Sequence, residues 1–157
     1  MAQIVPERVS AQIDGEFVVF LIGMRINRWW KVHKWVPTAL AMIRMQAELA
    51  RLPRDESGCL GTYTRGPAIT VQYWRSFEHL EAYAHAESHR HKSAWAWFNH
   101  AVGKARGDVG IWHETYVVQP GQYESLYSGM PAFGLGKAAG VVPATGQMKS
   151  ARRRLGR

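Results

Sequence analysis

The sequence of 157 residues contains a single cysteine, Cys59. One cysteine excludes an internal disulfide, and it excludes a zinc or iron–sulfur site built from cysteines of one chain. Such sparing use of cysteine fits a reducing compartment, so we expect a cytoplasmic protein.

Long apolar runs are also absent. The most apolar stretch, residues 17–24 (FVVFLIGM), has eight residues, and eight residues cannot cross a bilayer. Asp14 and Glu16 precede it, where a signal peptide carries positive charge. We therefore expect neither a signal peptide nor a membrane span.

Acidic residues are missing from Ser125 onward, where six basic residues occur: Lys137, Lys149, Arg152, Arg153, Arg154 and Arg157. The other 14 basic and 12 acidic residues leave the rest of the chain near +2, against a total of +8. The excess charge therefore lies in the tail, and this favours a solvated basic tail over a nucleic-acid-binding arm.

What the sequence does contain is an alternation of strand and helix patterns. Strands are expected at 16–25, 59–64, 68–74 and 108–118, and Arg65-Gly66-Pro67 predicts a hairpin turn. One helix is expected from Pro37 to about Leu52, because Met42, Met45, Leu49 and Leu52 form an apolar stripe. A second begins after the N-cap candidate Ser76 and is expected in two pieces, the later one at about 93–104. The order is β-α-β-β-α-β.

That order predicts an α+β, ferredoxin-like domain: a four-stranded antiparallel sheet with helices on one face. We expect an N-terminal arm at 1–14, the ferredoxin-like domain at 15–120, and an extension at 121–157 whose basic end is mobile. The bare sheet face needs cover, and a second copy would supply it as a dimeric α/β barrel.

Five segments carry a resemblance to a known family: MRINRWWKVHKW (24–35), VQYWRSFEHLEAYA (71–84), HKSAWAWFNHAVG (91–103), GDVGIWHETYVV (107–118) and MPAFGLGKA (130–138). They resemble, in the same order, the monooxygenases related to fumagillin biosynthesis, which are similar to small antibiotic-biosynthesis monooxygenases. The resemblance implies an enzyme that oxidises a hydrophobic, electron-rich small molecule with O2, without metal or flavin. Two alternatives stay open: a haem-binding oxygenase, peroxidase or aldoxime-dehydratase-like enzyme, and a non-catalytic dimeric module for a lipophilic ligand.

His113 is the foremost catalytic candidate. It shares a strand face with Ile111 and Val117, and the aliphatic face of the preceding strand carries Val71 and Tyr73. We expect the more aliphatic face to meet the helices, which would point His113 into the substrate cavity with Tyr73 as a lining residue. A core histidine bonded to a neighbour is the alternative. Glu114 and Trp112 would point the other way, toward an arginine or the dimer partner.

His91, Trp95 and Asn99 are spaced by four residues and share one helix face. A cofactor-free oxygenase needs a base tuned toward neutrality, a donor for the substrate anion and apolar walls. His91 or His113 as base, Asn99 as donor, and Trp95 and Phe98 as walls meet that list. A helix face packed on the sheet is the alternative.

Arg28 and Trp30 belong to a basic–aromatic cluster at residues 28–35. A cation–π corner is the first interpretation, a cavity mouth that binds substrate the second, and single-stranded nucleic acid the third. For haem, the candidate axial ligands are His100, late in the second helix, and His91. No motif indicates another metal site.

Overall fold

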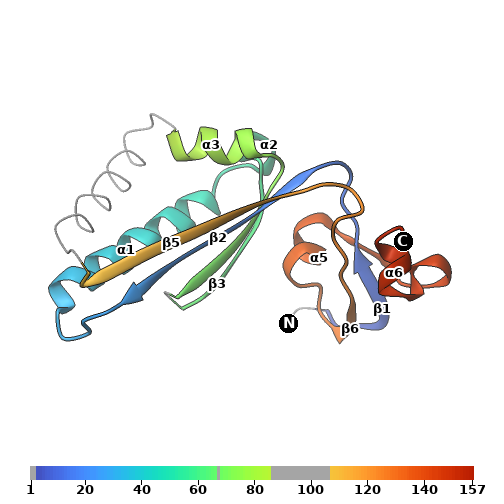
Figure 1. The fold of residues 1–157 in the computed structure, drawn as a ribbon, viewed down its shortest axis with the longest axis horizontal. Helices are drawn as coiled ribbons and strands as arrows, with labels where there is room; N and C mark the ends of the chain where they lie inside the picture. The colour runs from blue at the N-terminus through green and yellow to red at the C-terminus, as the bar shows by residue number, and fades with distance from the viewer. Residues whose placement is uncertain (1–2, 67, 86–106) are drawn as a thin grey trace.

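The computed structural model describes residues 3–66, 68–85 and 107–157. Two antiparallel sheets organise them (Figure 1). The larger sheet has four strands in the order β3-β4-β2-β5: β3 is Cys59–Arg65, β4 is Ile69–Trp74, β2 is Phe17–Ile26 and β5 is Val109–Val118. This is the strand order of the split β-α-β arrangement, and it confirms the α+β class and the four-stranded antiparallel sheet.

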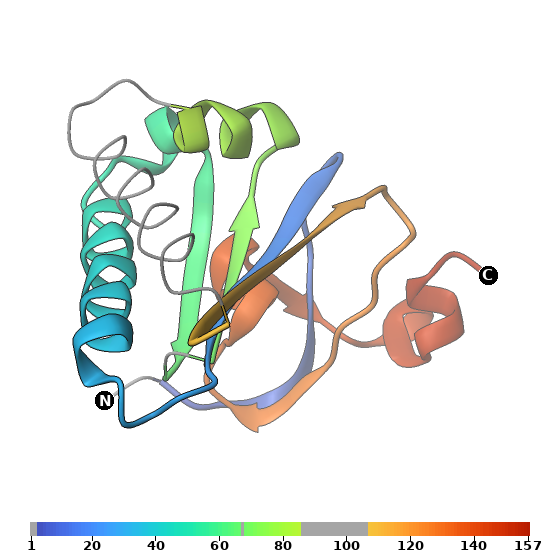
Figure 2. The same cartoon turned by 60° about the vertical axis from the view of Figure 1, so that its left-hand side comes forward.

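Helices α1 (Val32–Leu49) and α3 (Phe77–His85) cover one face of this sheet (Figure 2). The core between them contains Val18 and Trp74 from the sheet, Leu49 from α1 and Leu80 from α3. The predicted N-cap of α3 is present, because His79 N donates to Ser76 Oγ at 3.4 Å.

Helix α1 begins five residues before the predicted start. Residues 32–35 form its first turn, and Pro37 lies inside the helix. The turn is fixed from outside, because Lys31 Nζ and Lys34 Nζ both bind the buried carboxylate of Asp108. A short helix, α2 (Arg54–Ser57), follows α1, and Gly58 caps its C-terminal end with a φ of +70°.

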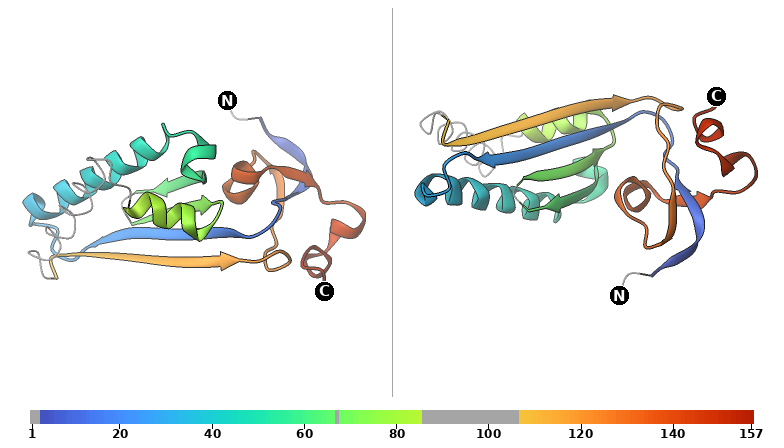
Figure 3. Two further views of the ribbon diagram at one scale, coloured as in Figure 1. Left: turned by 90° about the horizontal axis from the view of Figure 1, so that it is seen from above. Right: turned by 60° about the horizontal axis from the view of Figure 1, so that its bottom comes forward.

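A second, three-stranded sheet lies beyond one end of the first (Figure 3). Its order is β6-β1-β7, from β6 (Tyr127–Met130), β1 (Val5–Ala11) and β7 (Val141–Pro143). The segment predicted as an arm at 1–14 therefore supplies the central strand of this sheet.

The C-terminal extension holds regular elements: α5 (Gly134–Ala139), a 3-10 turn at Gly146–Lys149 and α6 (Ala151–Arg154). The 3-10 turn and α6 lie in the basic end, where Arg154 makes the long-range contact. Its side chain is 4% exposed, forms an ion pair with Glu124 and donates to the Met148 carbonyl at 2.8 Å. A buried guanidinium holds this end where apolar side chains are scarce.

Helix α5 packs against the sheet face opposite α1 and α3, at the end nearer the small sheet. Its Leu135 and Ala138 form a core with Phe17 of β2 and Leu60 of β3. In the described part of the chain, no helix is long and apolar enough to cross a membrane.

Candidate functional site

The candidate site is an apolar pocket between the four-stranded sheet and helices α1 and α3. It has a volume of about 700 Å³, counting the part open to solvent. Its described lining residues come from four elements: Phe20 and Ile22 of β2, Gln72 of β4, Met42, Met45 and Gln46 of α1, and Leu80, Tyr83 and Ala84 of α3. Mostly apolar walls with a few polar groups are typical of sites for hydrophobic small molecules.

Gln46 is held in a cycle of three hydrogen bonds with two threonines. Its Nε2 donates to Thr70 Oγ1 at 2.8 Å, and its Oε1 accepts from Thr64 Oγ1 at 2.5 Å. The Oγ1 atoms of Thr64 and Thr70 lie 3.1 Å apart. A hydroxyl has one proton, and that of Thr64 goes to Gln46, so Thr70 donates to Thr64. The cycle fixes the Gln46 side chain and pairs the fully buried Thr70.

Gln72 differs from Gln46 because the described residues bind only one end of its amide. Its Oε1 accepts from Trp74 Nε1 at 3.1 Å. Trp74 is fully buried, and its indole nitrogen is a donor only. The amide oxygen must therefore face Trp74, which leaves the Gln72 NH2 group as the end available to the pocket.

Tyr83 closes the pocket from α3. Its hydroxyl donates to the Met45 carbonyl at 3.3 Å, and burial raises its pKa well above the ordinary phenol value. Its ring lies 5.3 Å from that of Trp74, centroid to centroid. Tyr83 is therefore a neutral phenol that joins α3 to α1.

His113 lies on the helix-covered face, as predicted. It is paired with Ile22 across β2 and β5, and its ring lies 5.7 Å from that of Phe20, a pocket-lining residue. The imidazole is exposed. It is adjacent to the pocket wall that β2 supplies.

On strand β4, the face that meets the helices is not the one predicted. Register pairs Leu21 with both Val71 and Glu114, so Val71 and Tyr73 lie on the face away from α1 and α3. The helix-covered face of β4 carries Thr70, Gln72 and Trp74. Hydrogen bonds to Gln46 and within the Gln72–Trp74 pair make burial of these polar groups tolerable, which a hydrophobicity rule does not anticipate.

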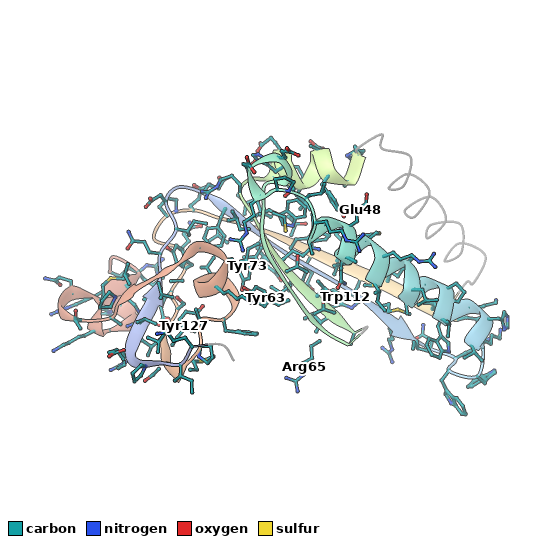
Figure 4. All side chains as sticks on the ribbon, turned by 180° about the vertical axis from the view of Figure 1, so that it is seen from behind. Glu48, Tyr63, Arg65, Tyr73, Trp112 and Tyr127 are labelled. Atoms are coloured by element: carbon teal, nitrogen blue, oxygen red, sulfur yellow. The ribbon has the colours of Figure 1, made fainter. Side chains whose placement is uncertain are left out.

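Tyr73, predicted to line the cavity, belongs instead to an aromatic cluster beside α5. Its ring lies 6.0 Å from that of Tyr63, which lies 5.1 Å from Phe133 (Figure 4). Burial raises the pKa of Tyr73 and of Tyr63. A Cβ on Gly136 would lie 2.7 Å from the Tyr127 ring, so α5 reaches this position only with glycine there.

Glu114 and Trp112 lie on the sheet face opposite His113, as predicted, and they share that face with Tyr73, which was predicted on the other. Glu114 accepts from the Tyr116 hydroxyl at 2.6 Å, which raises the pKa of Tyr116. Trp112 is paired with Gly23 of β2 (Figure 4).

Arg28 and Trp30 form a corner outside the pocket. Arg28 forms an ion pair with Asp108 at 3.0 Å, and Trp30 is 59% exposed with its ring edge-on to Trp29. The remaining predicted site residues lie outside the described residues: His91, Trp95, Phe98, Asn99 and His100. Among the described residues, no three His, Cys, Asp or Glu side chains are grouped to hold a metal ion.

Sequence reasoning missed Gln72, Gln46 and Tyr83. The sequence did contain a signal for Gln72. A glutamine two residues before a tryptophan lies on the same strand face, and its amide oxygen can accept a hydrogen bond from the indole N–H. Gln46 reaches the two threonines because helix α1 packs on the sheet, and this packing is a tertiary property.

Known proteins match this chain in both sequence and fold. A curated relative, Monooxygenase af470 of Aspergillus fumigatus, is 28% identical over 149 residues, covering 81% of this chain and 52% of the relative. The chain thus spans about half the length of that relative. The crystal structure of an aldoxime dehydratase, OxdRE, in complex with butyraldoxime superposes on 95% of this chain and 42% of its own, with a TM-score of 0.60 and 18% identity. At that identity the likeness is one of fold.

The family comparison confirms the resemblance seen in the sequence. The sequence-family model described as Monooxygenase af470-like matches residues 17–135. These residues span the four-stranded sheet, its helices and the start of α5. This chain therefore belongs to the Monooxygenase af470-like family.

Proposed function

We propose that this chain oxidises a hydrophobic, electron-rich small molecule with O2, without metal or flavin, in the pocket between the sheet and helices α1 and α3. The observation that carries the proposal is the pocket itself, whose walls are side chains such as Phe20, Met42 and Leu80. Such walls bind an apolar ring system and exclude water from a reactive carbanion. Membership of a monooxygenase family supports the reaction class.

In oxidation without a redox cofactor, the substrate supplies the electrons. For a methylene between unsaturated groups, a base removes a proton from carbon, and the carbanion transfers electrons to O2. Four electrons in total leave the substrate: one oxygen atom becomes a carbonyl oxygen on that carbon, and the other leaves as water.

The proton acceptor in this proposal is His113. Histidine is the side chain that most often serves as a general base in enzymes. Its position beside Phe20 puts it next to the pocket wall. His91 and Asn99, the other polar candidates from the sequence, remain predictions.

The test is oxygen uptake with anthrone, whose methylene lies between two aromatic rings. We expect one O2 consumed per anthraquinone formed, at a rate proportional to protein concentration. Ala84→Trp fills the pocket from α3 and should abolish the catalysed rate. Ala82→Trp is the matched control, because Ala82 is exposed on the same helix and is not among the lining residues.

His113→Ala tests the base. It should lower the rate by about 10²-fold or more, the usual contribution of general-base catalysis, while leaving thermal stability nearly unchanged because His113 is exposed. Unchanged turnover in this variant would remove His113 from the mechanism. Saturable anthrone binding without oxygen uptake would instead favour a binding module.

A haem enzyme is the second candidate, favoured by the fold shared with the aldoxime dehydratase. Its candidate ligands, His91 and His100, lie outside the described residues, so no step through haem is derived. An absorption spectrum during hemin titration decides: a saturable Soret band that His100→Ala or His91→Ala shifts would replace the cofactor-free proposal.

We also propose a homodimer. Beyond α5, the sheet face that carries Leu21 and Trp112 is covered by no described helix, and a second copy would bury it. Sedimentation equilibrium should give twice the 17.8 kDa chain mass.

A further inference from the structure

Gln72 is a pocket-lining residue whose amide oxygen and amide nitrogen differ in their partners. The residue is 7% exposed, and its amide oxygen accepts a hydrogen bond from Trp74 Nε1. Among the described residues, no side chain or carbonyl accepts a hydrogen bond from the amide nitrogen. The amide N–H groups are therefore the donors that Gln72 offers to a ligand in the pocket.

Trp74 determines which end of the amide faces the pocket. An unconstrained glutamine can present either oxygen or nitrogen by turning its amide through 180°. Here the indole N–H of Trp74 can only donate a hydrogen bond, so it requires the amide oxygen beside it. Turning Gln72 would place two donors against each other 3.1 Å apart. The pocket is therefore offered N–H donors and not a carbonyl acceptor.

The other polar groups of the lining do not compete for the same role. Both heteroatoms of the Gln46 amide are engaged by Thr64 and Thr70, and the Tyr83 hydroxyl donates to the Met45 carbonyl. Phe20, Ile22, Met42 and Leu80 offer no hydrogen bonds.

We infer that Gln72 determines substrate specificity: it donates from Nε2 to a carbonyl or phenolate oxygen on an otherwise apolar ligand. This rests on the proposed function for the identity of the pocket as the substrate site, and it adds the substrate class, a hydrophobic molecule with one acceptor oxygen. In the reaction, the same donor stabilises the negative charge that reaches that oxygen after deprotonation of the neighbouring carbon.

The test compares two probes that differ by one oxygen, 1-tetralone and tetralin, each titrated into the full chain by calorimetry. Wild type should bind the ketone more tightly. Gln72→Met keeps the side-chain length and removes the donor, so the ratio of the two affinities should fall about three- to tenfold, the usual worth of one neutral hydrogen bond. The ratio cancels general changes in stability and pocket volume.

Gln12→Met is the matched control. It removes an amide at an exposed position that is not among the lining residues, and the ketone-to-hydrocarbon ratio should stay at the wild-type value. An equal loss in both variants, or no loss in Gln72→Met, overturns the inference.

A measurement on the wild-type protein tests the inference even if the Gln72→Met variant folds poorly. Side-chain amide proton signals of ¹⁵N-labelled protein should include one pair that 1-tetralone shifts downfield and tetralin does not. A spectrum in which neither probe shifts any glutamine pair contradicts the inference.

Anthrone turnover separates the two proposals. If the ketone preference depends on Gln72 but anthrone is not oxidised, the ligand site is supported and the proposed oxidation is wrong. Oxidation with an affinity ratio unchanged by Gln72→Met retains the reaction and rejects the role of Gln72.

Discussion

Lys34 on α1 and Asp108 before β5 are joined by a hydrogen bond of 2.6 Å, across 74 residues of sequence. The Asp108 side chain is 4% exposed and also binds Lys31 at 2.9 Å and Arg28 at 3.0 Å. Asp108 thus fixes the start of α1 against the end of β2 and the start of β5, at one end of the pocket-forming helix.

Asp108→Asn should destabilise the protein, because three cations then lose their shared counter-charge while the side-chain shape is kept. A lower urea midpoint at pH 7 is the expected result. Asp55→Asn, on the exposed helix α2, should leave the midpoint nearly unchanged. Equal midpoints in wild type and Asp108→Asn would contradict the assignment.

The same cluster predicts a stability change in acid. Hydrogen bonds from Lys34 and Lys31 lower the pKa of Asp108 to about 2, from an unfolded value of about 3.9. A lowered folded-state pKa stabilises the protein above the unfolded pKa, and the contribution is lost as the pH falls from about 4 toward about 2. The difference in urea midpoint between wild type and Asp108→Asn should shrink over this range. A constant difference would rule the linkage out.

Thr70→Val should cost about 1–3 kcal/mol of unfolding free energy, because it removes a fully buried hydroxyl and leaves the half-buried Gln46 amide without its acceptor. Thr64→Val breaks the same cycle at an exposed residue, where water replaces the hydroxyl, and should cost less than about 1 kcal/mol. Chemical denaturation of both variants measures the difference, and a larger loss for Thr64→Val would disprove the cycle as described.

Gly58→Ala should destabilise by about 1–3 kcal/mol, because φ is +70° and the new Cβ would lie 2.3 Å from the His79 ring. Gly66→Ala separates the two causes. Its φ is +62° with nothing within 4 Å of the new Cβ, so it carries backbone strain alone. Thermal unfolding should rank Gly58→Ala as the less stable; the reverse order would exclude the contact with His79.

Glu124→Gln should release the C-terminal helix α6, because Arg154 is buried and loses its charge partner. Trypsin should then cleave the C-terminal basic sites about tenfold faster, since cleavage follows the population of the open form. Arg153→Gln, at an exposed position of the same helix, should not increase the cleavage rate. Equal rates in wild type and Glu124→Gln would show that this ion pair does not hold the helix.

Local patterns predicted the four-stranded sheet well because its evidence lies in neighbouring residues. The apolar run of β2, the Arg65–Gly66 turn and the cap at Ser76 are all short-range features. The start of α1 was missed because its first turn depends on Asp108, far along the chain. The second sheet was missed because residues 5–11 pair with strands more than 110 residues later.

The sequence by itself determined the class of fold and the family, since periodicity and motifs are written along the chain. Tertiary structure alone decided which face of β4 meets the helices. Strand register aligned Val71 with Glu114 and placed Gln72 and Thr70 inside. The burial of Thr70 is tolerated because Gln46 of α1 donates a hydrogen bond to its hydroxyl, and that long-range partner becomes visible only when the chain is folded.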